Sequence, residues 1–253
     1  MSIMNRFTIV KPLTLGKSSA KVDIVANKRS GKQYVLKRFI TLDSAAKNEI
    51  KVSKYLSQSR ANHIFPKVHE SGRNYLLLEY LKGYTSLNKQ TLQRMSNTTR
   101  KAIMFQLVFD LTEHKDFTHS DLHLFNIMIT SKYYDHKYRD ARGLKYCFRA
   151  PKVKLIDFGW SHVRGQSSFS WQRTFHRLTS GIHITGVYSK TNRLGWRNVG
   201  TSALDVHDNH DMRALRVLDH TILRGNMPSN VHTPFELLYF SVPNYFACLQ
   251  CAP

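Results

Sequence analysis

Apolar residues cluster or alternate in several short runs near the start of the chain. Residues 7–10, 22–25 and 34–40 form three such runs, and residues 27–32 are a polar stretch between the last two. Apolar runs bounded by polar stretches are typical of strands joined by turns. A fourth run, residues 75–81, ends at a Lys-Gly pair. The first third of the chain is therefore predicted to contain a small sheet.

Three other segments space their apolar residues as helices do. Residues 44–58 show a loose helical period, with Asp43 or Ser44 as the candidate N-cap. Residues 91–114 predict a buried helix, and residues 211–223 repeat the pattern nearer the C-terminus. Helices therefore dominate the later part of the predicted structure.

A change in the pattern after residue 81 divides the chain in two. Residues 126–130 and 153–156 look like two further strands that bracket an insertion at about 131–152. The order is strands with one helix, then a mostly helical part that contains a short hairpin. This order favours an α+β fold in two parts.

The charge of the chain is strongly unbalanced, with 38 lysine and arginine residues against 17 acidic residues and a net charge of +21. Such an excess favours polyanionic partners, namely nucleic acid, an acidic substrate protein or a DNA-packed particle, but a solvated basic surface explains it equally well. The insertion combines basic and aromatic side chains, which suit nucleic-acid backbone contact and stacking. They are Lys132, Lys137, Arg139, Arg142, Lys145, Arg149 and Lys152, with Tyr133, Tyr134, Tyr138 and Tyr146. A disordered, solvated loop is at least as good an interpretation.

Two classes of location are disfavoured by the composition. No apolar run approaches the ~20 residues of a membrane span, and the N-terminus lacks the apolar core of a secretory signal. The three cysteines, Cys147, Cys248 and Cys251, do not make a disulfide framework, which indicates a reducing compartment. Cys248 and Cys251 form a lone C-x-x-C pair, which we interpret as two ordinary thiols because a zinc site needs more ligands.

The candidate chemistry lies in residues 118–126, Thr-His-Ser-Asp-Leu-His-Leu-Phe-Asn, and residues 155–159, Leu-Ile-Asp-Phe-Gly. They place Asp121 five residues before Asn126, and Asp157 before a Phe-Gly pair. Phosphoryl transfer uses a carboxylate that orients and deprotonates a hydroxyl, and an amide oxygen and a second carboxylate that hold Mg²⁺. Each residue alone fits a turn, but turns do not explain their joint spacing.

These motifs resemble those of the protein-kinase superfamily, over residues 7–225 and most densely over 118–159. The resemblance implies a two-lobed α+β fold. Residues 1–81 would be a small, β-rich N-lobe, and residues 82–253 a mainly helical C-lobe that carries the basic insertion. ATP and Mg²⁺ would be the cofactors.

The resemblance assigns the catalytic and metal-binding roles. Asp121 would act on the substrate hydroxyl, while Asn126 and Asp157 would ligate Mg²⁺. Lys37, in a Val-Leu-Lys run on a predicted strand, would neutralise the α- and β-phosphates of ATP. Glu49 on the predicted helix would hold that lysine in place.

The nucleotide would be covered by a loop and held by a hinge. Gly16 and Ser18 lie where kinases carry the glycine-rich phosphate loop, but only one of its three glycines is kept. In the hinge, Leu78 would be the gatekeeper, and Glu79 and Leu81 would offer backbone groups to adenine.

The sequence departs from the family pattern at several points. Ser120 replaces the arginine that reads an activation-segment phosphate, so we predict activity that does not require phosphorylation there. His123 replaces a lysine and can donate a hydrogen bond to the γ-phosphate. No Ala-Pro-Glu closes the activation segment, and residues 200–203 stand in its place. Asp211, with Asp205 and Asp208 as competitors, resembles the aspartate that braces the catalytic loop.

The chain is most similar to serine/threonine protein kinases encoded by large DNA viruses. This implies a protein substrate, a virion- or DNA-associated role, and an intracellular location in host cytoplasm, nucleus or virion. Two alternatives use the same fold: a small-molecule phosphotransferase, which His123 favours, and a pseudokinase scaffold that binds nucleotide without turnover, which the poor glycine loop favours. A nucleic-acid-binding structural protein would explain the charge but not the order of the motifs. The oligomeric state is left open.

Overall fold

The structure, a computed structural model, describes residues 3–13, 19–58, 64–114, 116–140, 143–163 and 246–251. The predicted helix at 211–223, the segment 200–203 and the three candidate bracing aspartates lie outside these residues. Short 3-10 turns stand near both ends of the chain, at Ile3–Asn5 and Ala247–Leu249. No helix in the described part is long and apolar enough to cross a membrane.

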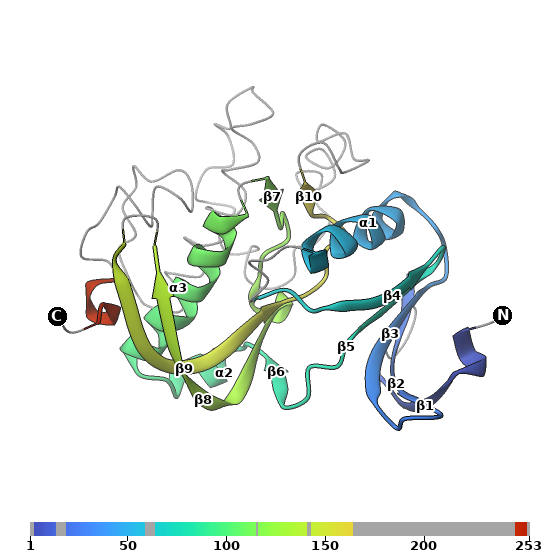
Figure 1. The fold of residues 1–253 in the computed structure, drawn as a ribbon, viewed down its shortest axis with the longest axis horizontal. Helices are drawn as coiled ribbons and strands as arrows, with labels where there is room; N and C mark the ends of the chain where they lie inside the picture. The colour runs from blue at the N-terminus through green and yellow to red at the C-terminus, as the bar shows by residue number, and fades with distance from the viewer. Residues whose placement is uncertain are drawn as a thin grey trace.

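A five-stranded antiparallel sheet forms most of the N-terminal part (Figure 1). Its strands lie in the order β1–β2–β3–β5–β4. Their bounds are β1 (Phe7–Pro12), β2 (Ala20–Asn27), β3 (Gln33–Phe39), β4 (Val68–Gly72) and β5 (Tyr75–Glu79). The four predicted strands are confirmed. Strand β4 escaped prediction because its sequence, Val-His-Glu-Ser-Gly, contains a single strongly apolar residue.

Helix α1 (Ser44–Gln58) packs against this sheet beside β4 (Figure 1). Asp43 caps its start, because Asp43 Oδ1 accepts a hydrogen bond from the backbone N–H of Ala46 at 2.8 Å. Ala46 is buried with Phe39 and Leu76 of the sheet. Further along α1, Asn48 and Glu49 are buried as well, so both turn toward the interior.

Two helices occupy the segment where one was predicted. Helix α2 (Lys89–Gln93) ends before Ser96, and Ser96 then caps α3 (Asn97–Glu113) by accepting a hydrogen bond from the N–H of Thr99 at 3.1 Å. Residues 102–112 of α3 are buried without interruption. A helix that is buried all round shows no amphipathic stripe, which is why the pattern predicted its existence better than its start.

A second, three-stranded sheet follows in the order β6–β8–β9, formed by β6 (Tyr84–Ser86), β8 (Ile127–Arg139) and β9 (Lys145–Leu155). Strands β8 and β9 pair from Ile127↔Leu155 out to Arg139↔Lys145, as one long curved ribbon along α3 (Figure 1). The interpretation of residues 131–152 as a disordered loop is therefore wrong. The two strands continue through the insertion because its side chains alternate between exposed and half-buried positions.

The inner face of this ribbon is anchored on one phenylalanine of α3. The ring centroid of Phe105 lies 5.3 Å from that of Tyr138, 4.5 Å from that of Tyr146 and 5.5 Å from that of Phe148. It also lies 5.1 Å from that of Phe246, near the C-terminus. Aromatic packing of this kind holds the ribbon, the helix and the chain end in one core.

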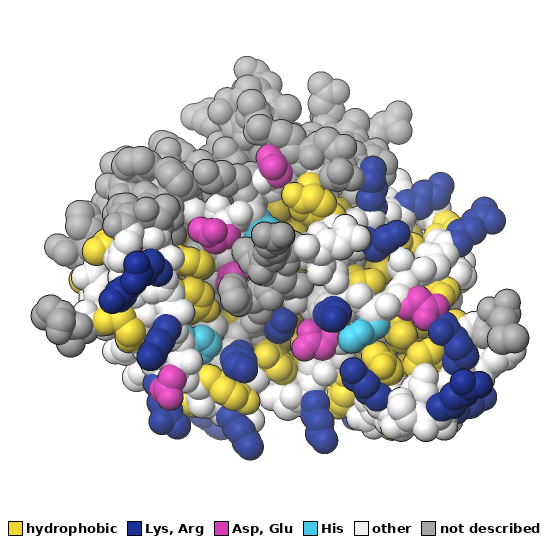
Figure 2. All heavy atoms as spheres, viewed as in Figure 1, with side chains coloured by type: hydrophobic (Ala, Val, Ile, Leu, Met, Phe, Trp, Pro, Cys, Tyr) yellow, Lys and Arg dark blue, Asp and Glu magenta, His cyan; other side chains and the backbone are white. Residues whose placement is uncertain are grey.

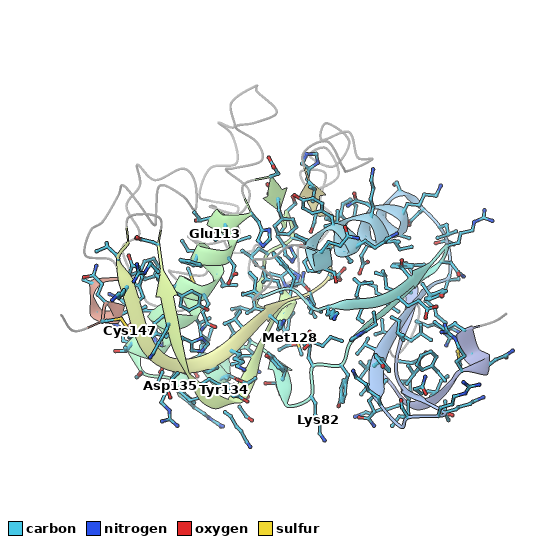
Figure 3. All side chains as sticks on the ribbon, in the orientation of Figure 1. Lys82, Glu113, Met128, Tyr134, Asp135 and Cys147 are labelled. Atoms are coloured by element: carbon cyan, nitrogen blue, oxygen red, sulfur yellow. A yellow bond between two sulfur atoms is a disulfide. The ribbon has the colours of Figure 1, made fainter. Side chains whose placement is uncertain are left out.

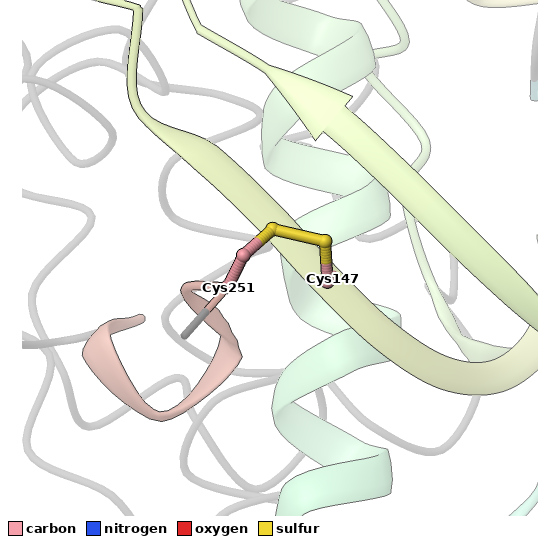
Figure 4. The surroundings of a disulfide bond; sticks show 2 residues. All are labelled: Cys147 and Cys251. Atoms are coloured by element: carbon pink, nitrogen blue, oxygen red, sulfur yellow. A yellow bond between two sulfur atoms is a disulfide. The ribbon is translucent and has the colours of Figure 1, made fainter. Parts of the chain in front are cut away.

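A disulfide joins the ribbon to the C-terminal turn (Figure 4). Cys147 on β9 pairs with Cys251, and Cys248 is a free, exposed cysteine. The backbone N–H of Cys251 also donates to Lys145 O at 3.0 Å. The expectation of two ordinary thiols near the C-terminus is therefore wrong for Cys251. Its partner lies 104 residues away in sequence, and no local pattern marks such a pair.

Candidate active site

Three charged side chains meet between the N-terminal sheet and the end of β9. Lys37 Nζ on β3 lies 2.6 Å from Glu49 Oε1 on α1 and 3.4 Å from Asp157 Oδ1. Lys37 and Glu49 are largely buried, while the Asp157 side chain is 51% exposed. The predicted lysine–glutamate pair is therefore present, and the lysine also faces the candidate metal ligand. Its neighbour Arg38 points to the opposite face and pairs with Asp23.

The neighbours of this trio shift its pKa values. Burial works against the charge on Lys37, but the carboxylates of Glu49 and Asp157 prevail and raise its pKa. Burial raises the pKa of Glu49 to about 7, with Lys37 opposing the rise and Asp157 adding to it. Partial burial of the half-exposed Asp157 carboxyl works against its ionisation, yet the nearby Lys37 and His119 hold its pKa below the ordinary value. Near neutral pH the site therefore keeps a charged ammonium beside an ionised Asp157.

The loop that carries Asp121 runs from β7 (Phe117–Thr118) to a 3-10 turn (Leu124–Asn126). Asn126 Nδ2 donates to the backbone O of Asp121 at 2.9 Å and lies 3.3 Å from Asp121 Oδ2. Because the amide nitrogen faces Asp121, the Asn126 amide oxygen is directed away from that carboxylate. The predicted base and the predicted metal ligand are therefore held together by the loop itself.

His123 belongs to the same cluster. Its Nε2 lies 3.1 Å from Asn126 Nδ2 and 3.6 Å from Asp121 Oδ2. An amide nitrogen can only donate, so Nε2 accepts in this arrangement and the ring proton is assigned to Nδ1. In this structure the histidine therefore accepts from the Asn126 amide, and its contact with a γ-phosphate stays a prediction.

Backbone hydrogen bonds tie this loop to the end of β9. Ile156 N donates to Asn126 O at 3.0 Å, and His119 Nε2 lies 3.1 Å from Ile156 O. Ser161 Oγ donates to His119 O at 3.0 Å, just before strand β10 (His162–Val163), which pairs with β7. Since Ile156 directly precedes Asp157, both candidate metal ligands are positioned by one connected network.

Two residues of the site adopt left-handed backbone conformations, Ser120 with φ of 63° and Asp157 with φ of 67°. This backbone conformation is energetically unfavourable for residues other than glycine. Residues that adopt it are found most often at functional sites, where a particular geometry is required. Phe158 helps to hold Asp157 in place. Its ring is buried with its centroid 5.8 Å from Phe65 and 5.5 Å from His119.

Sequence reasoning missed Asn48. This residue is fully buried on α1, and its Nδ2 donates to Ser161 O at 2.7 Å and to Gly159 O at 3.3 Å. Its neighbour Glu49 binds Lys37. Two successive residues of α1 therefore hold the lysine and the segment after Asp157. The one available signal was a polar residue at an inward-facing helix position.

The predicted hinge residues lie at the end of β5 and just after it. Leu78 is half-buried and packs with Ala20, Phe39 and Leu76. The carboxylate of Glu79 is engaged by Lys67 N at 3.2 Å and by Lys154 Nζ at 3.6 Å, and Lys154 also donates to the carbonyl of Phe65. Lys154 is a second residue that sequence reasoning missed. Contacts of Leu78, Glu79 and Leu81 with adenine stay predictions, and Gly16 and Ser18 lie outside the described residues.

The donor set suits a hard divalent cation held partly by its substrate. Mg²⁺ prefers oxygen ligands and is usually bound by one or two carboxylates with substrate phosphates, rather than by an all-protein cage. Asn126 and Asp157 supply an amide oxygen and a half-exposed carboxylate at two ends of the same network. In the described part of the chain, no group of three or more His, Cys, Asp or Glu residues could hold a metal ion without such help.

Comparisons with known proteins place this site within a known family and fold. The model of the ABC1 atypical kinase-like domain matches residues 31–174, a span that contains the site from Lys37 to Ser161 but not Gly16 or Ser18. A search of curated proteins gave no match. The crystal structure of a kinase domain is 18% identical, with a TM-score of 0.53, covering 92% of this chain and 69% of that chain. At this identity the likeness concerns the fold, and it confirms the predicted two-lobed, kinase-like α+β arrangement.

Proposed function

Because the chain belongs to the ABC1 atypical kinase-like domain family, we propose that it transfers the γ-phosphoryl group of ATP to a serine or threonine hydroxyl of a protein. Family membership supports a phosphotransferase of the kinase fold that uses ATP and a metal ion. The protein substrate and the choice of Mg²⁺ are our proposals within that class.

One observation carries the proposal. Lys37, Glu49 and Asp157 form one cluster, Asp121, His123 and Asn126 form another, and the Ile156–Asn126 hydrogen bond joins the two. These residues come from segments up to 120 positions apart. An ion pair that only stabilises the fold needs no further groups beside it. Phosphoryl transfer needs a buried lysine, an oriented aspartate and an accessible carboxylate in one place, and Lys37, Asp121 and Asp157 meet that need.

Each side chain then has a distinct task. Asp121 accepts the proton of the attacking hydroxyl, and the Asn126 amide, which is itself held by His123, fixes its orientation. Lys37 stays protonated and neutralises phosphate charge, with Glu49 holding its ammonium. Asn126 and Asp157 would hold Mg²⁺, which when bound neutralises charge on the phosphates. No side chain needs to form a covalent intermediate.

The proposal includes activity without a phosphorylated activation segment. Ser120 occupies the position of the phosphate-reading arginine, so it offers no cation for such a phosphate. In this structure the side chain of Asn48 instead holds the backbone of Gly159 and Ser161. A phosphatase-treated protein should therefore keep its activity.

The test is a phosphoryl-transfer assay with labelled ATP and Mg²⁺, alone and with casein, histone and an aminoglycoside. Asp121→Asn and Asp157→Asn should each reduce protein labelling by about 10²- to 10⁴-fold, the usual contribution of such groups. Asp135→Asn, an exposed acid on β8 with the same charge change, should leave labelling unchanged.

Other outcomes would replace the proposal. Label in the aminoglycoside selects a small-molecule phosphotransferase, the candidate that an Asp-x-His loop favours. Absence of label in any acceptor, with ATP still bound, selects a pseudokinase scaffold. An intracellular site of action, in host cytoplasm, nucleus or virion, is part of the proposal because ATP and the expected protein substrates are found there.

A further inference from the structure

The β8–β9 ribbon has two chemically different faces. Its inner face is aromatic: His136, Tyr138 and Phe148 stack on one another with interplanar angles between 10° and 22°. All three are half-buried, and Tyr138 and Phe148 lie against Phe105 of α3. Because side chains alternate along a strand, the intervening residues must face outward.

The outer face is basic. Its exposed residues include Lys137 and Arg139 on β8, and Lys145 and Arg149 on β9. Arg139 lies directly opposite Lys145 in the pairing register. The one acid on this face, Asp135, lies opposite Arg149. No ion pair joins any of the four cations to an acid among the described residues.

Two like charges directly opposite each other destabilise an antiparallel pair. The Arg139–Lys145 pair therefore opposes folding of the ribbon tip, and an anion bound across both strands would relieve the repulsion. Figure 2 shows lysine and arginine side chains gathered over this ribbon at the lower left of the molecule. In Figure 3 the labelled Cys147, Asp135 and Tyr134 are spread along the same ribbon.

We propose that the outer face of the β8–β9 ribbon, defined by Lys137, Arg139, Lys145 and Arg149, binds the phosphate backbone of double-stranded DNA. Only the outer face of the ribbon is available, because the inner face packs against α3, and its cations on both strands can contact the phosphates along the edges of the major groove of B-form DNA. The major groove of A-form RNA is too narrow for side chains to enter, which argues against duplex RNA. The net charge of +21 would add long-range attraction for the same polyanion.

An acidic protein suits this face less well. Protein interfaces have a largely apolar core and are depleted in lysine, whereas protein–DNA interfaces are strongly positive and polar. The large apolar side chains exposed on the ribbon and its turn are Tyr133 and Leu144, each 40% exposed. Two separated side chains do not form the buried centre that a protein partner would require.

The proposal is tested with the full chain and a 20-base-pair DNA duplex of random sequence. Binding is measured by fluorescence anisotropy between 50 mM and 300 mM salt. The ribbon variant combines Lys137→Gln, Arg139→Gln, Lys145→Gln and Arg149→Gln. The control variant combines Lys28→Gln, Arg29→Gln, Lys51→Gln and Lys54→Gln, which removes the same charge from exposed positions in the N-terminal part.

The ribbon variant should lower the magnitude of the slope of log Kobs against log[salt] by about 3 to 4, because each phosphate contact contributes roughly 0.9. The control variant should keep the slope of the unmodified chain. Phosphoryl transfer should be unchanged in both, since none of the eight residues belongs to the site. Circular dichroism verifies that the ribbon variant is folded.

Three results would overturn the proposal. Equal slopes for the two variants would mean that the whole-molecule charge attracts DNA. Equal affinity for duplex RNA, or for single-stranded DNA, would mean that the ribbon does not select a B-form groove. Tighter binding of polyglutamate than of DNA, lost in the ribbon variant, would assign the face to an acidic protein.

Discussion

Asn48 shows how much one side chain decides in this site. Its amide nitrogen donates to two carbonyls of the segment after Asp157, while the next residue, Glu49, holds Lys37. The position of α1 is thereby coupled to the backbone that carries the candidate metal ligand. Asn48 touches neither phosphate nor metal in this scheme, so it is a positioning residue.

Replacing Asn48 by alanine should lower kcat/KM for ATP about tenfold, the effect of losing one or two buried hydrogen bonds. The concentration of Mg²⁺ that gives half-maximal activity should rise as well, because Asp157 would be held less firmly. Lys47→Ala, an exposed neighbour on the same helix, is the control. Equal Mg²⁺ requirements in the two variants would contradict the positioning role.

Helix α3 carries a buried acid, Asp110, that should lower the free energy of unfolding at neutral pH. Asp110 is fully buried, and neither carboxylate oxygen has a hydrogen-bond partner within the described ranges. Burial therefore raises its pKa well above 3.8, with Lys154 opposing and Glu113 adding to the rise. A raised pKa in the folded state means that the folded chain binds this proton more tightly than the unfolded chain does.

The contribution of Asp110 is thus most favourable below about pH 3.8, the unfolded pKa, and is lost as the pH rises through the folded value. Asp110→Asn should remove that loss and raise the free energy of unfolding at pH 7 by about 1 to 3 kcal/mol. Urea unfolding at several pH values measures it. Glu113→Gln, exposed at the end of the same helix, should change stability by less than about 0.5 kcal/mol. A less stable Asp110→Asn protein at pH 7 would show that the carboxylate is satisfied.

The elements differ in how well their patterns revealed them. Strands β1, β2, β3 and β5 each show a clear apolar run, and α1 has both its period and its cap. The ribbon did not, because its inner face is aromatic and its outer face is charged, a mixture equally typical of a solvated loop. The pairing of β8 with β9 is what distinguishes a ribbon from a solvated loop here.

At the scale of the whole molecule, the Cys147–Cys251 disulfide joins the chain end to the ribbon (Figure 4). The loop that it closes is 104 residues long, and in the loop-entropy account a closure of that length stabilises by about 4 to 5 kcal/mol. The proposed reducing compartment would open this bond. The free energy of unfolding of the chain should therefore depend on whether its compartment is oxidising or reducing.

Cys251→Ser should lower the free energy of unfolding by up to about 4 to 5 kcal/mol under oxidising conditions. Cys248→Ser, which removes the free and exposed thiol, should leave it unchanged. With excess dithiothreitol all three proteins should unfold at the same denaturant concentration. If Cys251→Ser matches the unmodified chain before reduction, the pair is not bonded in solution.

The sequence alone determined the class of fold and predicted the candidate site residues. Lys37, Asp121, Asn126 and Asp157 could be recognised because each stands at a set spacing within a short segment, and short-range spacing is written directly in the chain. Only the tertiary structure decided which lone groups meet: Asn48 with the carbonyl of Ser161, Cys147 with Cys251, and Asp110 with no partner that the structure describes. Those outcomes depend on packing between segments far apart in sequence, and no local pattern of apolar and polar residues records it.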